Sequence, residues 1–270
     1  MYESYWKLSQ SPFQCGFDPE HVYTSSAHDE ALARLEFLVD NSRRLGLVVG
    51  PTGCGKSILL EVFARQLRRR GLQVATLNMF GIEERELLWN VAQQFGTLLS
   101  TEISHLKLWQ TVSDLIAEHR YQEQKTVLLS DDASEASEAA LKQIIRLACS
   151  HVLPDDRLTI VLVAKSDGVH ALGASLLERV EIKVEMEPWK LTDTIDYLRS
   201  SKNGERSDHL FTPDAERRLH ELAAGVPRRI NQIADLCLLA GVGGGLYQID
   251  AVTVENVYHE LDVHVDSGAL

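Results

Sequence analysis

The residues from Gly50 to Ser57 have the spacing Gly-x-x-x-x-Gly-Lys-Ser, which is the pattern of a phosphate-binding loop. An apolar run at 45–49 precedes this motif and a helical pattern over about 58–70 follows it, so the motif lies between a strand and a helix. In such a loop the glycines let backbone amides surround phosphate oxygens, and the positive end of the helix dipole adds to the attraction. We expect Lys56 to reach the outer phosphates and the Ser57 hydroxyl to bind Mg²⁺.

The whole motif and the residue after it are expected to contact the nucleotide. The predicted contacts are Gly50, Pro51, Thr52, Gly53, Cys54, Gly55, Lys56, Ser57 and Ile58. A glycine-rich turn with an incidental lysine is the alternative, which the flanking strand and helix disfavour.

An acidic pair, Asp131-Asp132, directly follows the apolar run 127–130. Ligands of open α/β sheets bind at the carboxyl ends of the strands, where this pair is predicted to lie. Phosphoryl transfer needs acidic groups near the metal, so we expect Asp131 to bind Mg²⁺ and Asp132 to orient or deprotonate the attacking water. The alternative is that both acids cap a helix beginning near Ser134.

Strand and helix patterns alternate before Pro188, whereas only helical patterns follow it. The expected strands are 45–49, 72–77, 126–129, 158–163 and 180–185, and the expected helices between them are 58–70, 83–99, 105–122 and 135–151. This alternation predicts a parallel sheet covered by helices on both faces. The later helices are expected at 192–201, 213–224, 228–240 and 252–261, with a flexible break at 241–245. We therefore predict an α/β nucleotide-binding core at 1–187, which includes an N-terminal segment 1–44, and a small all-helical lid at 188–270.

The composition is typical of a globular protein, with 44% hydrophobic and 24% charged residues in 270. No apolar run approaches the roughly 18 residues of a membrane span, and the N-terminus lacks a signal-peptide core, so we expect a cytoplasmic protein. The four cysteines are scattered, which disfavours a disulfide framework or a zinc site. A net charge of −12 disfavours DNA as a partner, and the basic run Arg68-Arg69-Arg70 is expected to be a solvated helix end rather than a nucleic-acid contact.

The chain resembles, over nearly its full length, the ATPase domain of the AAA+ proteins grouped with general secretion pathway protein A, the ExeA-like ATPases. The matching motifs are the aromatic opening 1–6, Pro12-Phe13, Tyr23, His28, Ala31-Leu32, the segment 188–197, Phe211-Thr212-Pro213-Asp214-Ala215 and Gly225-Val226-Pro227-Arg228-Arg229-Ile230-Asn231. The resemblance implies a P-loop NTPase (AAA+) core followed by a helical lid, hydrolysis of ATP with Mg²⁺, and a homo-oligomer in the nucleotide-bound state.

The resemblance also implies roles for residues outside the phosphate loop. Arg228 would be the lid's sensor arginine, which touches the γ-phosphate and couples lid closure to the nucleotide state. Arg179 matches the position of an arginine finger supplied to the neighbouring subunit, with a surface salt bridge as the alternative. Tyr23 and His28 would lie near the adenine, with helix packing as the alternative for both.

Two positions depart from the family pattern, and both concern catalysis. Asp132 stands where the family carries a glutamate, and a carboxylate displaced by about 1 Å costs roughly 100-fold in rate. The position of the polar sensor after the strand 158–163 reads Ala-Lys-Ser-Asp, so either Lys165 or Ser166 would serve there. The hypothesis is that the protein hydrolyses ATP slowly, or only when assembled on a partner.

The leading interpretation is an ATPase that drives the assembly or remodelling of a partner complex, by resemblance an envelope secretion or pilus apparatus. The sequence ends at Leu270 without the membrane span and cell-wall-binding region of full-length secretion members, so we expect it to act either through another protein, as a peripheral protein at the inner membrane, or in another process. One alternative is a DNA-associated regulator similar to the AAA+ ATPases that assist transposition. Another is a nucleotide-switch module without useful hydrolysis.

Overall fold

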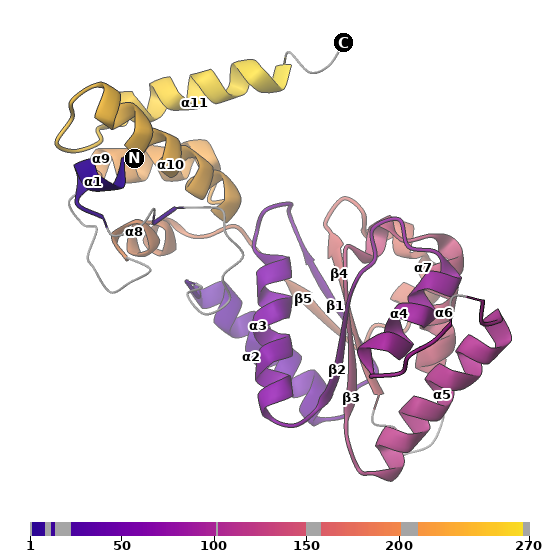
Figure 1. Cartoon of the computed structure of the whole chain (residues 1–270). Helices are drawn as coiled ribbons and strands as arrows, with labels where there is room; N and C mark the ends of the chain where they lie inside the picture. Colours follow the sequence, from indigo (N-terminus) through magenta and orange to yellow (C-terminus); the bar gives the residue numbers. More distant parts are fainter. Residues whose placement is uncertain are drawn as a thin grey trace. The chain divides into compact units, whose positions relative to one another are not determined.

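The structure of the chain, a computed structural model, forms two compact units (Figure 1). One comprises His28–Thr52 and Lys56–Met186, and the other comprises Met1–Ala27, Gly53–Gly55 and Glu187–Leu270. The residues that the structure describes are 2–8, 12–13, 23–100, 102–149, 158–200 and 210–266, without the side chains of 262–266. Each unit is described by itself below.

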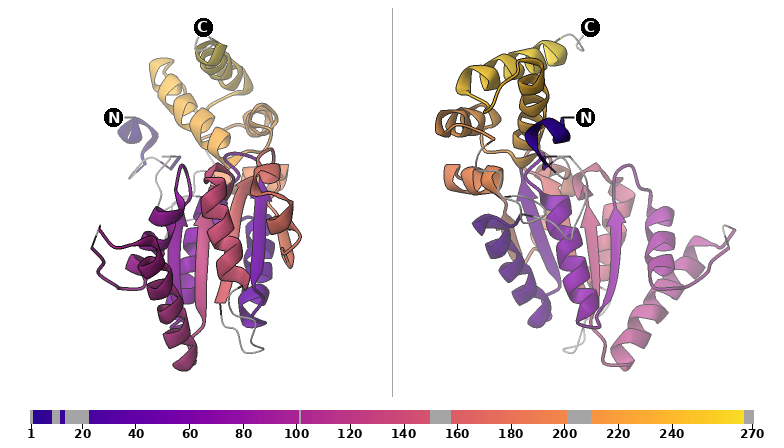
Figure 2. Two further views of the ribbon diagram at one scale, coloured as in Figure 1. Left: turned by 90° about the vertical axis from the view of Figure 1, so that its right-hand side faces the viewer. Right: turned by 60° about the vertical axis from the view of Figure 1, so that its left-hand side comes forward.

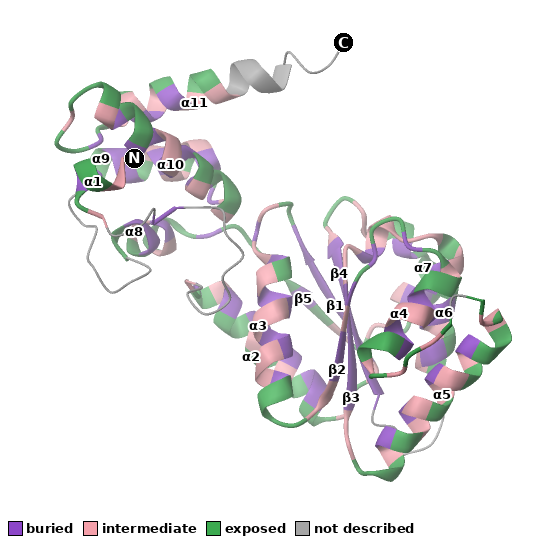
Figure 3. Cartoon of the chain, viewed as in Figure 1, coloured by how far each residue is buried: buried purple, intermediate pink, exposed green. Residues whose placement is uncertain are grey.

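The first unit is built on a five-stranded parallel sheet in the order β2-β3-β4-β1-β5. The strands are β1 (Leu45–Gly50), β2 (Gln73–Asn78), β3 (Thr126–Asp131), β4 (Leu158–Lys165) and β5 (Ile182–Glu185). The three central strands are almost entirely buried, as a sheet covered on both faces requires (Figure 3). The strands lie where the sequence predicts them, and the parallel sheet confirms the predicted fold class.

Helices cover both faces of this sheet (Figure 2). The helices that follow one another along this part of the chain are α2 (Ser26–Asp40), α3 (Lys56–Arg69), α4 (Glu84–Gln94), α5 (His105–Tyr121), α6 (Glu138–Cys149) and α7 (Ala174–Leu177). On one side α2 and α3 pack, and on the other α4, α5 and α6 enclose an extensive apolar cluster, which includes Leu88, Val112 and Ile144. The sheet therefore has two covered faces and two edges, β2 and β5.

The second unit is helical. Its helices are α1 (Glu3–Trp6), α8 (Leu191–Arg199), α9 (Pro213–Ala223), α10 (Pro227–Gly243) and α11 (Ala251–Asp266). Thr212 caps α9 by accepting a hydrogen bond from the backbone amide of Ala215, and Pro213 occupies the first turn, as predicted. The break expected at 241–245 begins later, because α10 continues through Gly243. The lack of a side chain at Gly241 makes room for Trp6, whose ring would lie 2.7 Å from an added Cβ.

The N-terminal residues belong to a different unit from the one that the sequence predicts. We expected residues 1–44 to belong to the sheet-containing core, but residues up to Ala27 group with the helical unit. The Trp6 indole donates a hydrogen bond to the carbonyl of Leu238, 2.9 Å away. The ring of Phe13 lies 5.9 Å from both Tyr197 and Phe211. These contacts bury large apolar surfaces in the helical unit, so Trp6 and Phe13 of the N-terminal motifs are structural parts of its core.

Two further boundaries differ from the sequence prediction for local reasons. Helix α4 ends at Gln94 instead of Leu99, because Gly96 follows in a left-handed conformation with φ of 84°. Helix α6 begins at Glu138 rather than Glu135, since residues Ala133–Glu135 form a separate short 3₁₀ helix.

Candidate nucleotide-binding site

The phosphate loop connects the last residue of β1 to the first residue of α3. Lys56 is buried, and its Nζ donates hydrogen bonds to the carbonyl oxygens of Gly50 and Pro51, at 2.7 and 2.8 Å. An added Cβ at Gly50 would lie 2.7 Å from the carbonyl oxygen of Met186, so only glycine fits at the end of this strand. The lysine is thus fixed inside the loop, with its ammonium group close to the backbone that would surround a phosphate.

The middle of the loop depends on glycine conformations. Gly53 and Gly55 have φ values of 87° and 90°, in the left-handed region that residues with side chains rarely adopt. Gly53–Gly55 group with the helical unit, in which the backbone amide of Arg228 donates to the Gly53 carbonyl oxygen at 3.3 Å. Ser57, at the second position of α3, is exposed at the N-terminal end of a 14-residue helix. Such an end presents free amides to an anion.

The acidic pair begins at the carboxyl end of β3. Asp131 is the last residue of the strand, is half-buried, and accepts a hydrogen bond from the Asp132 backbone amide at 2.9 Å. Asp132 is half-buried and has a left-handed backbone with φ of 50°. It precedes the short helix Ala133–Glu135 but its side chain makes no capping hydrogen bond. Helix capping therefore does not account for Asp132.

Strand order brings the loop and the acidic pair to the same edge of the sheet. Only β4 separates β1 from β3, so their carboxyl ends are about 10 Å apart. The last residue of β4, Lys165, is in register with Gly50. The next amide, that of Ser166, donates to the Gly50 carbonyl oxygen at 3.2 Å. The end of β1, where the loop begins, and Asp131 therefore lie at one edge of the sheet with one strand between them.

The side chain of Lys165 forms an ion pair with Glu135, with 2.8 Å between Nζ and Oε1. Glu135 raises the pKa of Lys165, and Asp132 and Asp167 contribute to the same effect. Lys165 was among the residues expected at this edge, whereas Glu135, only three residues after Asp132, was not. The sequence signal that could have identified Glu135 was its closeness along the chain to the acidic pair Asp131-Asp132. A lysine and a further carboxylate thus lie at the carboxyl edge of the sheet.

The exposed Arg179 lies just after α7. Its guanidinium donates to the backbone carbonyl and to the hydroxyl of Ser175, the latter at 3.1 Å, and to the Cys149 sulfur at 3.4 Å. Within the part of the chain that the structure describes, Arg179 makes no ion pair. The salt-bridge alternative is therefore not seen here.

Of the two aromatic side chains expected near adenine, Tyr23 packs against rings of the helical unit. Tyr23 lies edge-on against Trp189 and Tyr197, with ring centroids 5.3 and 5.4 Å apart. His28 is buried in α2. For Tyr23 the helix-packing alternative therefore describes the observed contacts.

The side chains at this edge suit Mg²⁺ bound to a phosphate chain. Mg²⁺ prefers oxygen ligands and is usually held by one or two protein groups together with substrate phosphates and water. Ser57 and Asp131 supply such oxygens. Over the described ranges there is no cluster of three or more His, Cys, Asp or Glu side chains that would hold a metal ion alone. None of the described helices is long and apolar enough to cross a membrane.

Comparisons with known proteins agree with this geometry. Residues 39–172 match the family described as "AAA domain". The chain is 26% identical to General secretion pathway protein A of Aeromonas hydrophila, over 99% of this chain and 50% of that protein. It therefore spans about half the length of this curated relative.

Solved structures share the fold. The Aeropyrum pernix Orc1 protein in complex with DNA has a TM-score of 0.65 at 15% identity, covering 89% of this chain and 67% of that one. The Thermotoga maritima RuvB Holliday junction branch migration motor has a TM-score of 0.58 at 14% identity, covering 88% of this chain and 70% of that one. At these identities the likeness concerns the fold alone. With its parallel sheet, its helical unit and the match of residues 39–172 to the AAA domain, the chain is thus similar to AAA ATPases, and over nearly its whole length to General secretion pathway protein A.

Proposed function

We propose that this chain binds ATP with Mg²⁺ at the carboxyl edge of its sheet and hydrolyses it to ADP and phosphate. The observation that carries the proposal is the placement of the buried Lys56 loop and Asp131 at one edge, one strand apart. A phosphate-binding loop without an acid at that distance would bind an anion but would lack a carboxylate ligand for the metal.

Each residue has a role in the proposed reaction. Lys56, already held by two carbonyl oxygens of the loop, would turn to the outer phosphates of the nucleotide. Ser57 and Asp131 would hold Mg²⁺, which when bound neutralises charge that develops on the phosphate oxygens. Asp132 would orient or deprotonate the attacking water. Lys165, paired with Glu135, places a positive charge beside this carboxylate.

We infer that hydrolysis is slow in the isolated chain. The carboxylate of Asp132 is one methylene shorter than the glutamate of the family pattern. Its left-handed backbone favours this shorter side chain, because aspartate adopts that conformation more readily than glutamate. Arg179 would complete the site of a neighbouring subunit, and Arg228 would report the nucleotide state to the helical unit. The backbone hydrogen bond from Arg228 to Gly53 supports a role next to the loop.

The nucleotide cycle would drive the assembly or remodelling of a partner complex. Similarity to General secretion pathway protein A supports an envelope secretion apparatus as that partner. Because this chain spans half of that relative, the partner and the pathway belong to the proposal.

Isothermal titration calorimetry with ATP, with and without Mg²⁺, tests the proposal. We expect the wild type to bind in the micromolar range, and Asp131→Ala to remove the enhancement by Mg²⁺ while leaving metal-free binding in place. Asp114→Ala, which removes an exposed acid on α5, is the matched control and should behave as the wild type. Absence of any binding heat from folded wild-type protein would refute the proposal.

A further inference from the structure

The two edges of the sheet differ in how they are protected. Edge β5 has four residues, and its Lys183 and Glu185 form an exposed ion pair. Edge β2 has six residues, Gln-Val-Ala-Thr-Leu-Asn, with neither a charge nor a proline. Proteins usually protect an edge strand with charges, prolines, bulges or shortness, because its free peptide groups can pair with another chain. Strand β2 is therefore protected neither by charges nor by prolines, and it is of ordinary length.

The peptide groups that face outward from β2 can be identified. The amide of Gln73 donates to the Lys125 carbonyl oxygen at 3.0 Å, and the amide of Met79 donates to the Asp131 carbonyl oxygen at 2.8 Å. Peptide groups alternate in direction along a strand, so odd-numbered residues face β3. The amides and carbonyls of Thr76 and Asn78 therefore face away from β3, toward the edge of β2 on which none of the described strands pairs; this side is called the open edge below.

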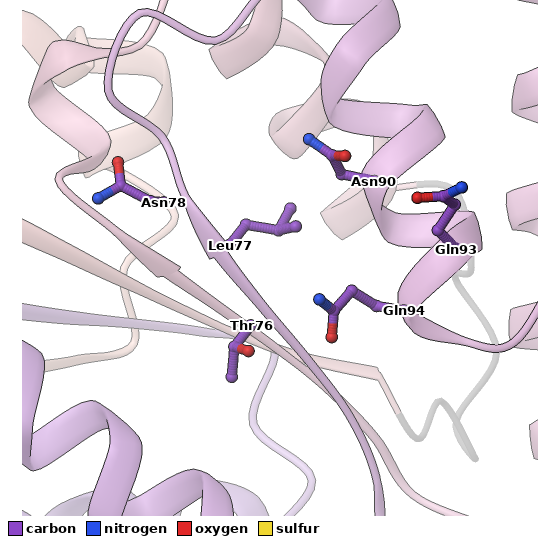
Figure 4. A pocket seen from close by; sticks show the side chains of 6 residues that line it. All are labelled: Thr76, Leu77, Asn78, Asn90, Gln93 and Gln94. Carbon is purple, nitrogen blue, oxygen red and sulfur yellow. The ribbon is translucent and has the colours of Figure 1, made fainter. Parts of the chain in front are cut away.

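A polar groove of about 530 Å³ lies along this edge. It is lined by Thr76, Leu77, Asn78, Asn90, Gln93 and Gln94. Figure 4 shows Asn90 and Gln94 reaching from α4 toward β2. Among the described residues these two amides have no hydrogen-bond partner, so their donors and acceptors are not used by the fold. Because an uncharged amide both donates and accepts hydrogen bonds, it can bind peptide groups and amide or hydroxyl side chains.

A positive charge also lies at this edge, on the side of the sheet that α3 covers, whereas the groove is lined by residues of α4. The Arg68 guanidinium donates to the Thr76 hydroxyl oxygen at 3.4 Å, and Arg68 and Arg69 are both exposed. A carboxylate opposite Thr76 on an added strand would therefore meet a cation. A second copy of this chain, paired through a two-fold axis at Thr76, would instead bring the two Arg68 side chains together, which disfavours that occupant.

We propose that the open edge of β2 binds an extended segment of a partner protein as an additional strand. The segment carries an aspartate or glutamate opposite Thr76, and amide or hydroxyl side chains on the face that meets Asn90 and Gln94. Main-chain hydrogen bonds supply the affinity and the alternating side chains supply the specificity, as in other cases of strand addition. This site is separate from the nucleotide chemistry, so its test does not depend on hydrolysis.

An array of immobilised heptapeptides, with every residue type at the central position and Ser, Thr, Gln or Asn elsewhere, tests the proposal with the full chain. We expect the wild type to be captured preferentially by peptides with a central Asp or Glu. Arg68→Ala should lower capture by these acidic peptides about tenfold, because a hydrogen bond to a charged group is lost. The double variant Asn90→Ala/Gln94→Ala should weaken capture of all peptides.

Thr76→Pro removes the outward amide without touching the ladder to β3, since proline is tolerated at an edge where the N–H faces solvent. It should abolish capture, with circular dichroism and ATP binding showing that the fold is kept. Gln232→Ala, an exposed amide on α10, is the matched control and should change nothing. The proposal is overturned if no peptide is captured above background, or if folded Thr76→Pro or the double variant captures the same peptides as the wild type. Retention of a single-stranded oligonucleotide through Arg68 and Gln94 would also overturn it, because the groove would then be a nucleic-acid site.

Discussion

Replacing Asp132 by glutamate is expected to have two effects, a faster hydrolysis of ATP and a lower stability of the folded protein. The added methylene extends the carboxylate toward the position that the family glutamate occupies. A misplacement of about 1 Å costs roughly 100-fold in rate. We therefore expect Asp132→Glu to raise the single-turnover rate of ATP hydrolysis by up to about 100-fold, which corresponds to about 2.7 kcal/mol of activation free energy.

The same substitution should lower the stability of the folded protein. Asp132 has φ of 50°, in the left-handed region, which costs most residues about 1–2 kcal/mol and costs aspartate less. For a domain of this size, a loss of about 1 kcal/mol lowers the melting temperature by roughly 2–4 °C. The variant should thus be faster and less stable.

Quenched-flow hydrolysis under single-turnover conditions, together with thermal unfolding followed by circular dichroism, measures both effects. Asp132→Asn is the matched control: asparagine also tolerates the left-handed backbone, so this variant should keep the melting temperature and lose hydrolysis. If Asp132→Glu left the rate unchanged in a folded protein that still binds ATP, the proposed role of Asp132 would be wrong.

Four further substitutions test other parts of the structure. Lys56→Ala removes hydrogen bonds from a charged donor and should weaken ATP binding roughly 100-fold or more in calorimetry while circular dichroism stays unchanged. Arg179→Ala should leave the ATP affinity of the monomer unchanged and lower assembly-stimulated turnover by up to about 10³-fold; an equal loss in dilute monomer would contradict action on a neighbour. Burial lowers the pKa of His119, so the unfolded chain takes up a proton more readily and stability falls as the pH drops below about 6.5; the decrease in melting temperature from about pH 7.5 to 5.5 should be smaller in His119→Gln. Gly225→Ala would place a Cβ 2.4 Å from a backbone oxygen at φ of 67° and should cost about 2–5 kcal/mol in thermal unfolding, whereas Gly245→Ala, at φ of 63° in open space, should cost only the conformational strain.

Local patterns allowed most of the sheet-containing unit to be predicted. The β-branched and leucine runs of β3 and β4 are buried on both faces, so their composition alone marks them as interior strands. The phosphate loop is recognisable because its function needs particular residue types at fixed spacing within eight positions. Asp131 follows from its place at the end of a strand, since carboxyl ends of parallel strands share one edge.

Contacts between distant residues were harder to predict. The pairing of Lys165 with Glu135 joins the end of β4 to a short helix after β3, and nothing near either residue in the sequence specifies the partner. The sequence prediction places the N-terminal aromatic residues in the core domain, as part of the segment 1–44. Trp6 and Phe13 instead complete an apolar cluster of the helical unit. Their hydrophobicity indicates burial, but not the surface against which they are buried.

The sequence by itself determined the strands, the phosphate loop and the acidic pair, because each of these is encoded by residues that are neighbours along the chain. Only the tertiary structure decided that β4 lies between the loop and Asp131, that Lys165 meets Glu135, and that the uncharged strand β2 lies at an edge. The physical reason is that strand order and side-chain pairing arise from how surfaces pack over the whole chain, whereas residue types record only the need for burial or for a particular turn.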